Sequence, residues 1–486
     1  MSKKINFSNE VELQKLFGHE AAEDEEPTRL REYYFKSNVY DQIVCDLSLR
    51  LLVGHKGIGK SALFQVAMQE EKEKDRLTIL IKPDDIAEIS GDKSDFLREI
   101  RAWKKGITEI IAKKVLVSQG LMYDGWRKKL NQYGGEIIEF LVATFEEETP
   151  NLNSSKKLFV DEFLKKKKIS IYIDDLDRGW EGKKNDIRRI SALLNAVRDI
   201  ATENRGIYFR VSLRSDVYYL VRTSDESTDK IEGSVIWHSW SNHEIFVLLI
   251  KRIESYFDRT VNESKLLKDD QNTLSRYLNP IMKPIFNGRG HWKQIPTYRI
   301  LMSLIRKRPR DLVKLCTLAG RDAGENNDKI IGTENFQNIF EEYSQGRLQD
   351  TINEYRSELP DIERLLLGMK PKKINKTTKE GYIYNTEELL KKISNIMEQG
   401  SFRFSDGSIA TKKDIAAFLY KINFLTARKE SENGITRKYF EESRYLSSKF
   451  IDFGFSWEVH PAYRWALQPD SQWDIYKNLK LADNIK

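Results

Sequence analysis

Residues 54 to 61 have the spacing of a loop that binds nucleotide phosphates. The sequence Gly54-His-Lys-Gly-Ile-Gly-Lys-Ser61 fits the pattern G-x-x-x-x-G-K-[ST]. Glycines let the backbone curl so that successive N–H groups point at phosphate oxygens, and the positive end of the following helix faces the same anion. A glycine-rich turn between a strand and a helix is the alternative without chemistry. The residues predicted to contact the nucleotide are Gly54, His55, Lys56, Gly57, Ile58, Gly59, Lys60, Ser61 and Ala62.

Two side chains of this loop have specific roles in the prediction. Lys60 is expected to reach the β- and γ-phosphates as a point charge, and the Ser61 hydroxyl is expected to bind Mg²⁺. The flanking sequence fits, because the apolar run at residues 49–53 predicts a buried strand and the spacing of apolar residues in 61–72 predicts a helix. The predicted cofactors are therefore ATP, or another nucleoside triphosphate, and Mg²⁺.

A second apolar run, at residues 169–173, ends in acidic residues. Asp174 and Asp175 follow it directly. In P-loop proteins we expect this strand beside the strand that leads into the loop. Asp174 is then the candidate that holds Mg²⁺, and Asp175 is the candidate that positions and activates the attacking water. Adjacent carboxylates leave a strand on opposite sides, so the two can divide these tasks. A cluster that caps a helix is the alternative.

Six segments, in order along the chain, resemble one family of proteins. They are FGHEAAEDE (17–25), VGHKGIGKSAL (53–63), IYIDDLDRGW (171–180), SLRSDVYYL (212–220), RPRDL (308–312) and VHPAYRWAL (459–467). Together they resemble the bacterial P-loop ATPases allied to the KAP and STAND classes, which include FunZ-like proteins. The phosphate loop and the IDDLDR segment are specific by themselves, whereas the others count mainly through their order and spacing. The resemblance implies an ATPase core followed by helical and winged-helix-like parts.

The resemblance also implies two arginines that sense the nucleotide. In STAND relatives an arginine at the end of the strand predicted at residues 207–213 senses the γ-phosphate, and Arg214 occupies that position. A planar guanidinium suits this role. Arg310 lies in the first turn of a helix that Pro309 would begin, and it is the candidate that approaches the phosphates from a later helix. A structural ion pair is the alternative for each arginine. The predicted catalytic residues are Lys60, Asp175, Arg214 and Arg310.

Strands and helices alternate in the first half of the chain, which predicts an α/β fold, a P-loop NTPase parallel sheet with helices on both faces. From about Ser241 onward helical patterns dominate. The predicted domains are an N-terminal segment (1–46), a P-loop ATPase core (47–240) with a helical insertion at about 92–168, a helical lid or regulatory domain (241–369), a basic linker (370–382) and a winged-helix-like C-terminal domain (383–486).

Composition bears on three kinds of partner: nucleic acid, metal ions and membranes. Among 486 residues there are 81 Lys and Arg against 74 Asp and Glu, a weaker excess than nucleic-acid binders usually have. Cys45 and Cys316 match no metal-ligand spacing and are expected to be small, buried and reduced. No segment resembles a signal peptide or a run of roughly 18 apolar residues. We therefore expect a cytoplasmic protein without a membrane partner.

We interpret several aromatic residues and one histidine as structural rather than ligand-binding. Tyr33, Tyr34, Phe35 and Tyr40 precede the strand that leads into the loop, where many such ATPases contact adenine. Core packing is the stronger interpretation for each of them. His460 is expected to be a bonded structural histidine rather than a ligand.

The predicted function is that of a Mg-dependent ATPase that couples nucleotide state to conformational change or assembly. The resemblance implies a place in bacterial defence against phage, beside an effector protein. Two alternatives stay open: a nucleotide-bound switch or scaffold with negligible hydrolysis, and a DNA-binding regulator that acts through the winged-helix region. A homo-oligomer and nucleic acid stay open as further partners.

Overall fold

The computed structural model describes residues 4–74, 76–89, 95–118, 169–204, 206–224, 226–371, 381–431, 434–448, 454–468, 475–476 and 479–481. Most of the predicted insertion at 92–168 and of the predicted linker at 370–382 lies outside these residues. The chain forms two compact units, and each is assembled from segments that are distant in sequence. Unit 1 contains Met1–Phe35, Lys56–Gly59 and Ser239–Lys486, and unit 2 contains Lys36–His55 and Lys60–His238.

Unit 2 is built on a five-stranded sheet with the order β2-β3-β4-β1-β5, in which every pair of neighbours is parallel. The strands coincide with the apolar runs of the sequence, and β3 is buried along its whole length. Strands that are covered on both faces have continuous apolar sequences, so the apolar runs predicted their positions. The strands are β1 (Leu49–Val53), β2 (Leu77–Ile81), β3 (Ile169–Ile173), β4 (Ile207–Leu213) and β5 (Val235–Trp237).

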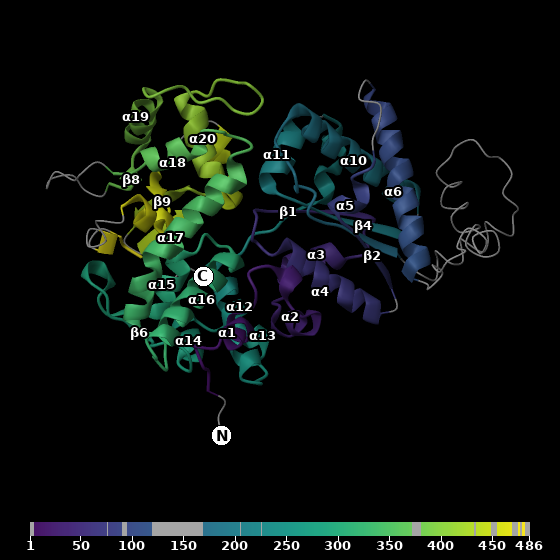
Figure 1. Cartoon of the computed structure of the whole chain (residues 1–486). Helices are drawn as coiled ribbons and strands as arrows, with labels where there is room; N and C mark the ends of the chain where they lie inside the picture. Colours follow the sequence, from purple (N-terminus) through teal and green to yellow (C-terminus); the bar gives the residue numbers. More distant parts are fainter. Residues whose placement is uncertain are drawn as a thin grey trace, which may run out of the picture. The chain divides into compact units, whose positions relative to one another are not determined.

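Helices pack on both faces of this sheet (Figure 1). Helices α3 (Asn38–Val44) and α4 (Lys60–Glu73) lie on one face, and α6 (Phe96–Ser118) and α10 (Lys184–Glu203) lie on the other. The core between the sheet and α10 includes Leu193 and Val197, both fully buried. The predicted α/β fold with a parallel sheet is confirmed. The shorter elements are α5 (Pro83–Ile86), α11 (Ser215–Ser224) and η3 (Glu226–Ser234).

The prediction that the acidic strand lies beside the strand that leads into the loop is wrong. Strand β4 separates them, because it pairs with β3 on one edge and with β1 on the other. β4 has seven residues and is therefore long enough to pair along the full length of both five-residue neighbours. All of its residues except Tyr208 are buried, as expected for a strand inside the sheet. The last residues of β4 therefore lie between the loop and the acidic residues, a relation that sequence order does not reveal.

Unit 1 is mainly helical. The N-terminal helix α1 (Glu10–Phe17) packs against α12 (Asn242–Tyr256) and α16 (Pro309–Glu325), and α16 packs against α17 (Thr333–Tyr355). Helix α16 begins at Pro309, as predicted. The other elements of this part are α2 (Pro27–Tyr33), α13 (Glu263–Leu266), α14 (Gln271–Ser275), α15 (Thr297–Leu304), α18 (Ile362–Gly368) and the hairpin β6 (Ile285–Phe286) and β7 (Ile295–Pro296).

The C-terminal part of unit 1 combines two longer helices, and the short helices α21 (Tyr445–Ser448) and α22 (Arg464–Leu467), with a small antiparallel sheet of order β10-β9-β11-β8. A hairpin of β9 and β10 follows the second helix. This arrangement matches the predicted winged-helix-like part. Its elements are β8 (Ile383–Tyr384), α19 (Thr386–Met397), α20 (Lys412–Lys421), β9 (Leu425–Ser431), β10 (Gly434–Lys438) and β11 (Ser456–Val459).

The four aromatic residues before β1 are buried in their units, with Tyr33, Tyr34 and Phe35 in unit 1 and Tyr40 in unit 2. Cys316 is buried as expected, but Cys45 is half-exposed, so the prediction was wrong for that residue. Cys45 lies in the turn where the chain leaves α3 for β1, and its Sγ contacts the Gln42 carbonyl at 3.0 Å. Turn position, not apolarity, decides its exposure.

His460 is a buried, bonded histidine. Its Nδ1 accepts a hydrogen bond from the Ala462 N–H at 3.1 Å, and its Nε2 lies 2.8 Å from the Tyr439 hydroxyl. Because Nδ1 accepts, the neutral ring is protonated at Nε2. Burial, followed by the charges of Arg437 and Arg306, lowers the pKa of His460 to about 3.

This pKa predicts a loss of stability in mild acid. The unfolded chain takes up a proton on His460 as the pH falls below 6.5, whereas the folded chain does not until about pH 3. Stability from this residue is therefore complete above pH 6.5 and falls by about 2 kcal/mol at pH 5. Chemical denaturation at pH 7.5 and pH 5 measures it. His460→Asn keeps a capping oxygen without a titrating ring, and an unchanged pH dependence in that variant would contradict the assignment.

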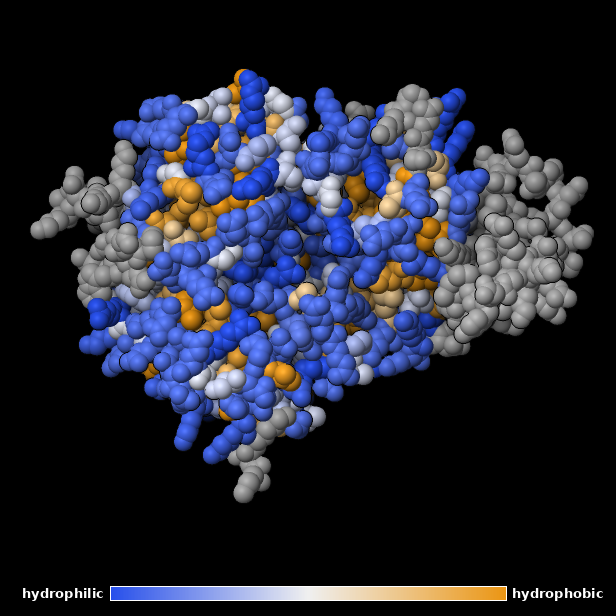
Figure 2. Space-filling model, in the orientation of Figure 1, coloured by the Kyte–Doolittle hydropathy of each residue, from blue (hydrophilic) through white to orange (hydrophobic). Residues whose placement is uncertain are grey.

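The surface in Figure 2 is mostly hydrophilic, with apolar side chains in scattered positions. Exposed examples are Leu97 in unit 2 and Ile409 in unit 1. None of the helices in the described part of the chain has the length and apolarity needed to cross a membrane.

Candidate functional site

The loop that follows β1 has the curled backbone that phosphate binding requires. Gly57 and Gly59 have φ angles of +78° and +101°, in the left-handed region that favours glycine. A Cβ added to Gly57 would lie 3.2 Å from the Cβ of Arg310. Helix α4 begins directly after the loop, at Lys60, so its N-terminal N–H groups are available to an anion. Ser61 and Ala62 lie half-buried in its first turn.

The amine of Lys60 lies against the main chain at the start of the loop. Its Nζ donates to the carbonyl oxygens of Gly54 at 2.9 Å and His55 at 3.2 Å. A positive charge is therefore held beside the glycine turn, where an anion would be bound. The donor set fits a polyphosphate, because it combines main-chain N–H groups, a helix N-terminus and an ammonium.

Two histidines beside the loop are buried. The His55 Nδ1 lies 3.1 Å from the Ser215 hydroxyl, so the buried His55 side chain is directed into unit 2. His238, directly after β5, is fully buried, and its N–H donates to the Val53 carbonyl at 2.7 Å. Burial, together with the charge of Lys60, lowers the pKa of His238 to about 3. A neutral imidazole thus lies near the Lys60 amine, which sequence reasoning did not anticipate.

The two aspartates after β3 differ in environment. Asp174 is buried and accepts a hydrogen bond from the Ser212 hydroxyl of β4. Asp175 is exposed and has a φ of +61°, an uncommon conformation for a residue other than glycine. Both residues follow the end of β3 at Ile173, so the opposite directions expected for neighbours within a strand stay a prediction. Ser212 was missed by sequence reasoning, although a lone hydroxyl near the end of an apolar strand is a usable signal.

Arg214 is held by acidic residues. Its guanidinium binds Asp216 with two hydrogen bonds, of 3.0 and 2.6 Å, and lies 3.4 Å from Asp177. The side chain of Arg214 is nine-tenths buried. Its position after β4 agrees with the prediction, and the contacts are those of the structural ion pair that was the alternative.

Arg310 touches the tip of the loop, which belongs to unit 1 as Arg310 does. Its N–H points to the Gly57 carbonyl at 3.4 Å, and its Nε donates to the Glu20 carbonyl at 3.1 Å. The segment FGHEAAEDE, which was noted only for its resemblance, therefore contributes main chain beside Arg310. Of the other predicted residues, Lys60, Ser61, Asp174, Asp175 and Arg214 all belong to unit 2.

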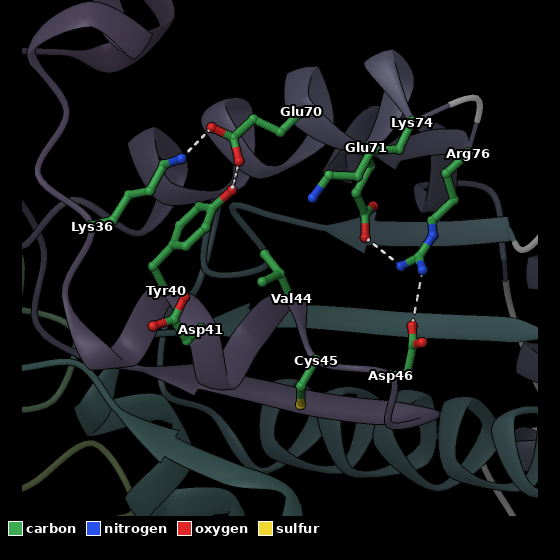
Figure 3. Close-up of a pocket in the computed structure, with 10 residues that line it drawn as sticks. All are labelled: Lys36, Tyr40, Asp41, Val44, Cys45, Asp46, Glu70, Glu71, Lys74 and Arg76. Atoms are coloured by element: carbon green, nitrogen blue, oxygen red, sulfur yellow. Dashed lines mark hydrogen bonds and ion pairs between the residues drawn. The ribbon is translucent and has the colours of Figure 1, made fainter.

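A cavity of about 480 Å³ lies in unit 2 between α3, α4 and the start of β2 (Figure 3). Its charged groups largely bind one another: Glu70 pairs with Lys36, and Arg76 pairs with Glu71 and Asp46. The Tyr40 hydroxyl also donates to Glu70. Since acids and bases neutralise each other there, the lining selects no class of ligand.

The strand order and the loop together decide the fold class. A parallel sheet of order 2-3-4-1-5, a glycine loop after β1 and an acidic pair after β3 occur together in one architecture. The chain has a P-loop NTPase fold.

Comparison with protein families agrees with part of the resemblance. Residues 243–352 match the FunZ-associated C-terminal helical domain. A protein of Escherichia coli (strain K12), named putative transposon gamma-delta 80.3 kDa protein, is 26% identical over 351 residues. That similarity covers 64% of this chain, and the chain spans about half, 48%, of that relative.

Among the solved structures that match, two illustrate a distant likeness. The Walker-type ATPase PABY2304 of Pyrococcus abyssi has 13% identity and a TM-score of 0.40, with 85% of this chain and 95% of that chain covered. The ORC1 protein of Aeropyrum pernix, solved in complex with DNA, has 12% identity and a TM-score of 0.32, with 95% and 92% covered. TM-scores of this size describe a distant likeness, and the fold class rests on the strand order and the loop.

Proposed function

We propose that the chain is a Mg-dependent ATPase whose nucleotide state drives conformational change or assembly. The observation that carries the proposal is the Lys60 amine, held 2.9 Å from the Gly54 carbonyl in a glycine loop at the start of α4. A loop of this kind serves phosphate binding in proteins with this fold.

The residues around the loop divide the proposed work. The main-chain N–H groups from Gly57 to Ser61 and the Lys60 amine would bind the phosphates. Ser61 and the buried Asp174 would hold Mg²⁺, which supplies positive charge against the phosphate oxygens when it is bound. Ser212 supports this assignment, because its hydrogen bond orients Asp174. The exposed Asp175 would orient the attacking water and accept its proton.

The two arginines have separate proposed roles. Arg310, whose side chain lies against Gly57, would bind the phosphates at the tip of the loop. Arg214 would sense the γ-phosphate only by exchanging part of its contact with Asp177 and Asp216 for contact with the nucleotide. If Arg214 contacts the nucleotide in one conformation and the aspartates in the other, the bound triphosphate stabilises the first conformation. A ligand can drive a conformational change only through such a difference in contacts. The helical part and the winged-helix-like part would respond to it.

Asp175→Asn tests the enzymatic part of the proposal. The amide keeps the shape of the side chain but cannot accept a proton, so steady-state ATP turnover should fall about a hundredfold. Binding of Mg-ATP, measured by calorimetry, should change little. Asp95→Asn, at an exposed carboxylate just before α6, is the matched control and should leave turnover unchanged.

Two results would count against this proposal. Turnover that survives Asp175→Asn would remove Asp175 from its role. A wild-type protein that binds Mg-ATP tightly but completes less than one turnover would favour the alternative of a nucleotide-bound switch or scaffold. The name of the Escherichia coli relative connects it with a transposon. We propose by extension that this chain acts in a setting of mobile elements or of defence against them, beside an effector protein. Co-purification with the chain is the experiment that would identify this effector.

A further inference from the structure

The tip of the phosphate loop is part of unit 1. Residues Lys56–Gly59 pack within that unit, whereas the start of the loop, to His55, and its end, from Lys60, belong to unit 2. Ile58 is buried in the hydrophobic core of unit 1. Residues far away in the sequence therefore determine the conformation of the tip, and the loop motif itself does not contain them.

Trp240 makes the shortest of these contacts. Its indole Nε1–H donates to the Ile58 carbonyl at 2.7 Å, and both side chains are buried, at 3% and 4% exposure. The indole ring is itself held beside Phe35, with the ring centroids 6.1 Å apart. A rigid, buried donor therefore fixes the direction of this carbonyl.

Because the peptide bond is planar, the hydrogen bond from Trp240 to the Ile58 carbonyl also fixes the direction of the Gly59 N–H. In a trans peptide the C=O of one residue and the N–H of the next point in opposite directions. When Trp240 fixes the Ile58 carbonyl on the packed side of the loop, the Gly59 N–H must point to the other side. The Arg310 N–H acts in the same way on the Gly57 carbonyl, at 3.4 Å, and so directs the Ile58 N–H.

A third contact holds the first residue of the tip. The Glu354 carboxylate of α17 accepts a long hydrogen bond, of 3.4 Å, from the Lys56 N–H. Glu354 is fixed in turn by the buried Arg308, at 3.0 Å. The tip is thus contacted at three successive residues by Glu354, Arg310 and Trp240.

We propose that Trp240 is a positioning residue for nucleotide binding, whose indole N–H turns the Gly59 N–H toward the phosphates. This rests on the proposed function of the loop. Trp240 touches no phosphate itself, and it acts through the peptide between Ile58 and Gly59. Sequence motifs do not include it, because it lies 182 residues from Ile58.

Trp240→Phe is the test, with Trp292→Phe as its matched control. Trp292 is also a buried tryptophan of unit 1, and its Nε1–H donates to a main-chain carbonyl, that of Leu479, at 2.9 Å. Amide hydrogen exchange of residues 54–61 is measured first, without nucleotide, and Mg-ATP affinity and steady-state kinetics follow. Trp240→Phe should speed exchange in the loop and weaken ATP binding about tenfold. KM should rise more than kcat falls, and Trp292→Phe should change neither exchange nor affinity.

The outcomes separate this proposal from the function on which it rests. Failure of the wild-type protein to bind Mg-ATP overturns the proposed function. Binding by the wild type, with equal affinity and equal loop exchange in Trp240→Phe, overturns the role of Trp240 alone. Equal losses in Trp240→Phe and Trp292→Phe would show a general effect of packing and would also overturn it. If Trp240→Phe does not fold, benzothienylalanine at position 240 replaces it, since this residue has the shape of tryptophan without the N–H, and the same results decide.

Discussion

Lys60→Ala should reduce ATP turnover about a thousandfold, because it removes the ammonium that the Gly54 and His55 carbonyls hold in the phosphate loop. In the structure this amine is already held by the carbonyls of Gly54 and His55, so it is positioned before any ligand arrives. A phosphate that replaces these carbonyls gains a charge-assisted hydrogen bond without the cost of ordering a long side chain. Turnover at saturating Mg-ATP measures the loss in catalysis, and calorimetry measures the loss in nucleotide affinity.

The control for this prediction lies on the same helix. Lys72→Ala removes an exposed lysine near the end of α4, and it should leave turnover and affinity within twofold of the wild type. A comparable loss in both variants would indicate a general effect of charge on α4. Undiminished turnover in Lys60→Ala would remove the loop from the mechanism altogether.

The loop and the sheet could be predicted because their signals are local. Strand β3 is buried on both faces, so its apolar run is continuous, and the glycines of the loop are required where φ is positive. Pro309 predicted the start of α16 for an equally local reason, since its fixed φ suits the first turn of a helix. Each of these inferences needs only residues that are close together in the chain.

The position of β4 could not be predicted in this way. Strand order depends on which edges pair, and β4 pairs with both β1 and β3 although other elements separate them in sequence. The error had a consequence at the site, because Ser212, which binds Asp174, is on β4. The contact of Trp240 with the Ile58 carbonyl could not be predicted for the same reason, since only the tertiary fold brings the two residues together.

The start of α16 contains a buried group of charges that the motif RPRDL does not reveal. Asp311 is almost fully buried and accepts hydrogen bonds from Arg306, at 2.7 and 2.8 Å, and from Arg347, at 2.8 Å. Burial alone would raise the pKa of Asp311, but the charges of Arg306 and Arg347 outweigh it and hold the pKa far below its usual value. The carboxylate therefore stays ionised and pairs with two arginines that have little access to water, of which Arg347 also binds Asp350.

Asp311→Asn should lower the free energy of unfolding of unit 1 by about 3–5 kcal/mol, because the buried Arg306 loses its carboxylate partner and the buried Arg347 is left with the exposed Asp350. Denaturation followed by far-UV circular dichroism measures this. The expected loss is a large part of the stability of a typical domain. Since Asp311 follows Arg310 directly, ATP affinity should weaken as well, even under conditions in which the variant remains folded.

An exposed ion pair between α1 and the same helix, α16, is the control. Arg321 of α16 binds Glu10 at 2.6 Å, and both side chains are about 45% exposed. Glu10→Gln removes one charge just as Asp311→Asn does, but water solvates the remaining arginine, so the loss should stay below about 1 kcal/mol. The ratio of the two effects isolates burial as the cause. If Asp311→Asn cost no more than Glu10→Gln, the buried charges would not stabilise the start of α16, and Arg310 would have to be positioned by its contacts with Gly57 and Glu20 alone.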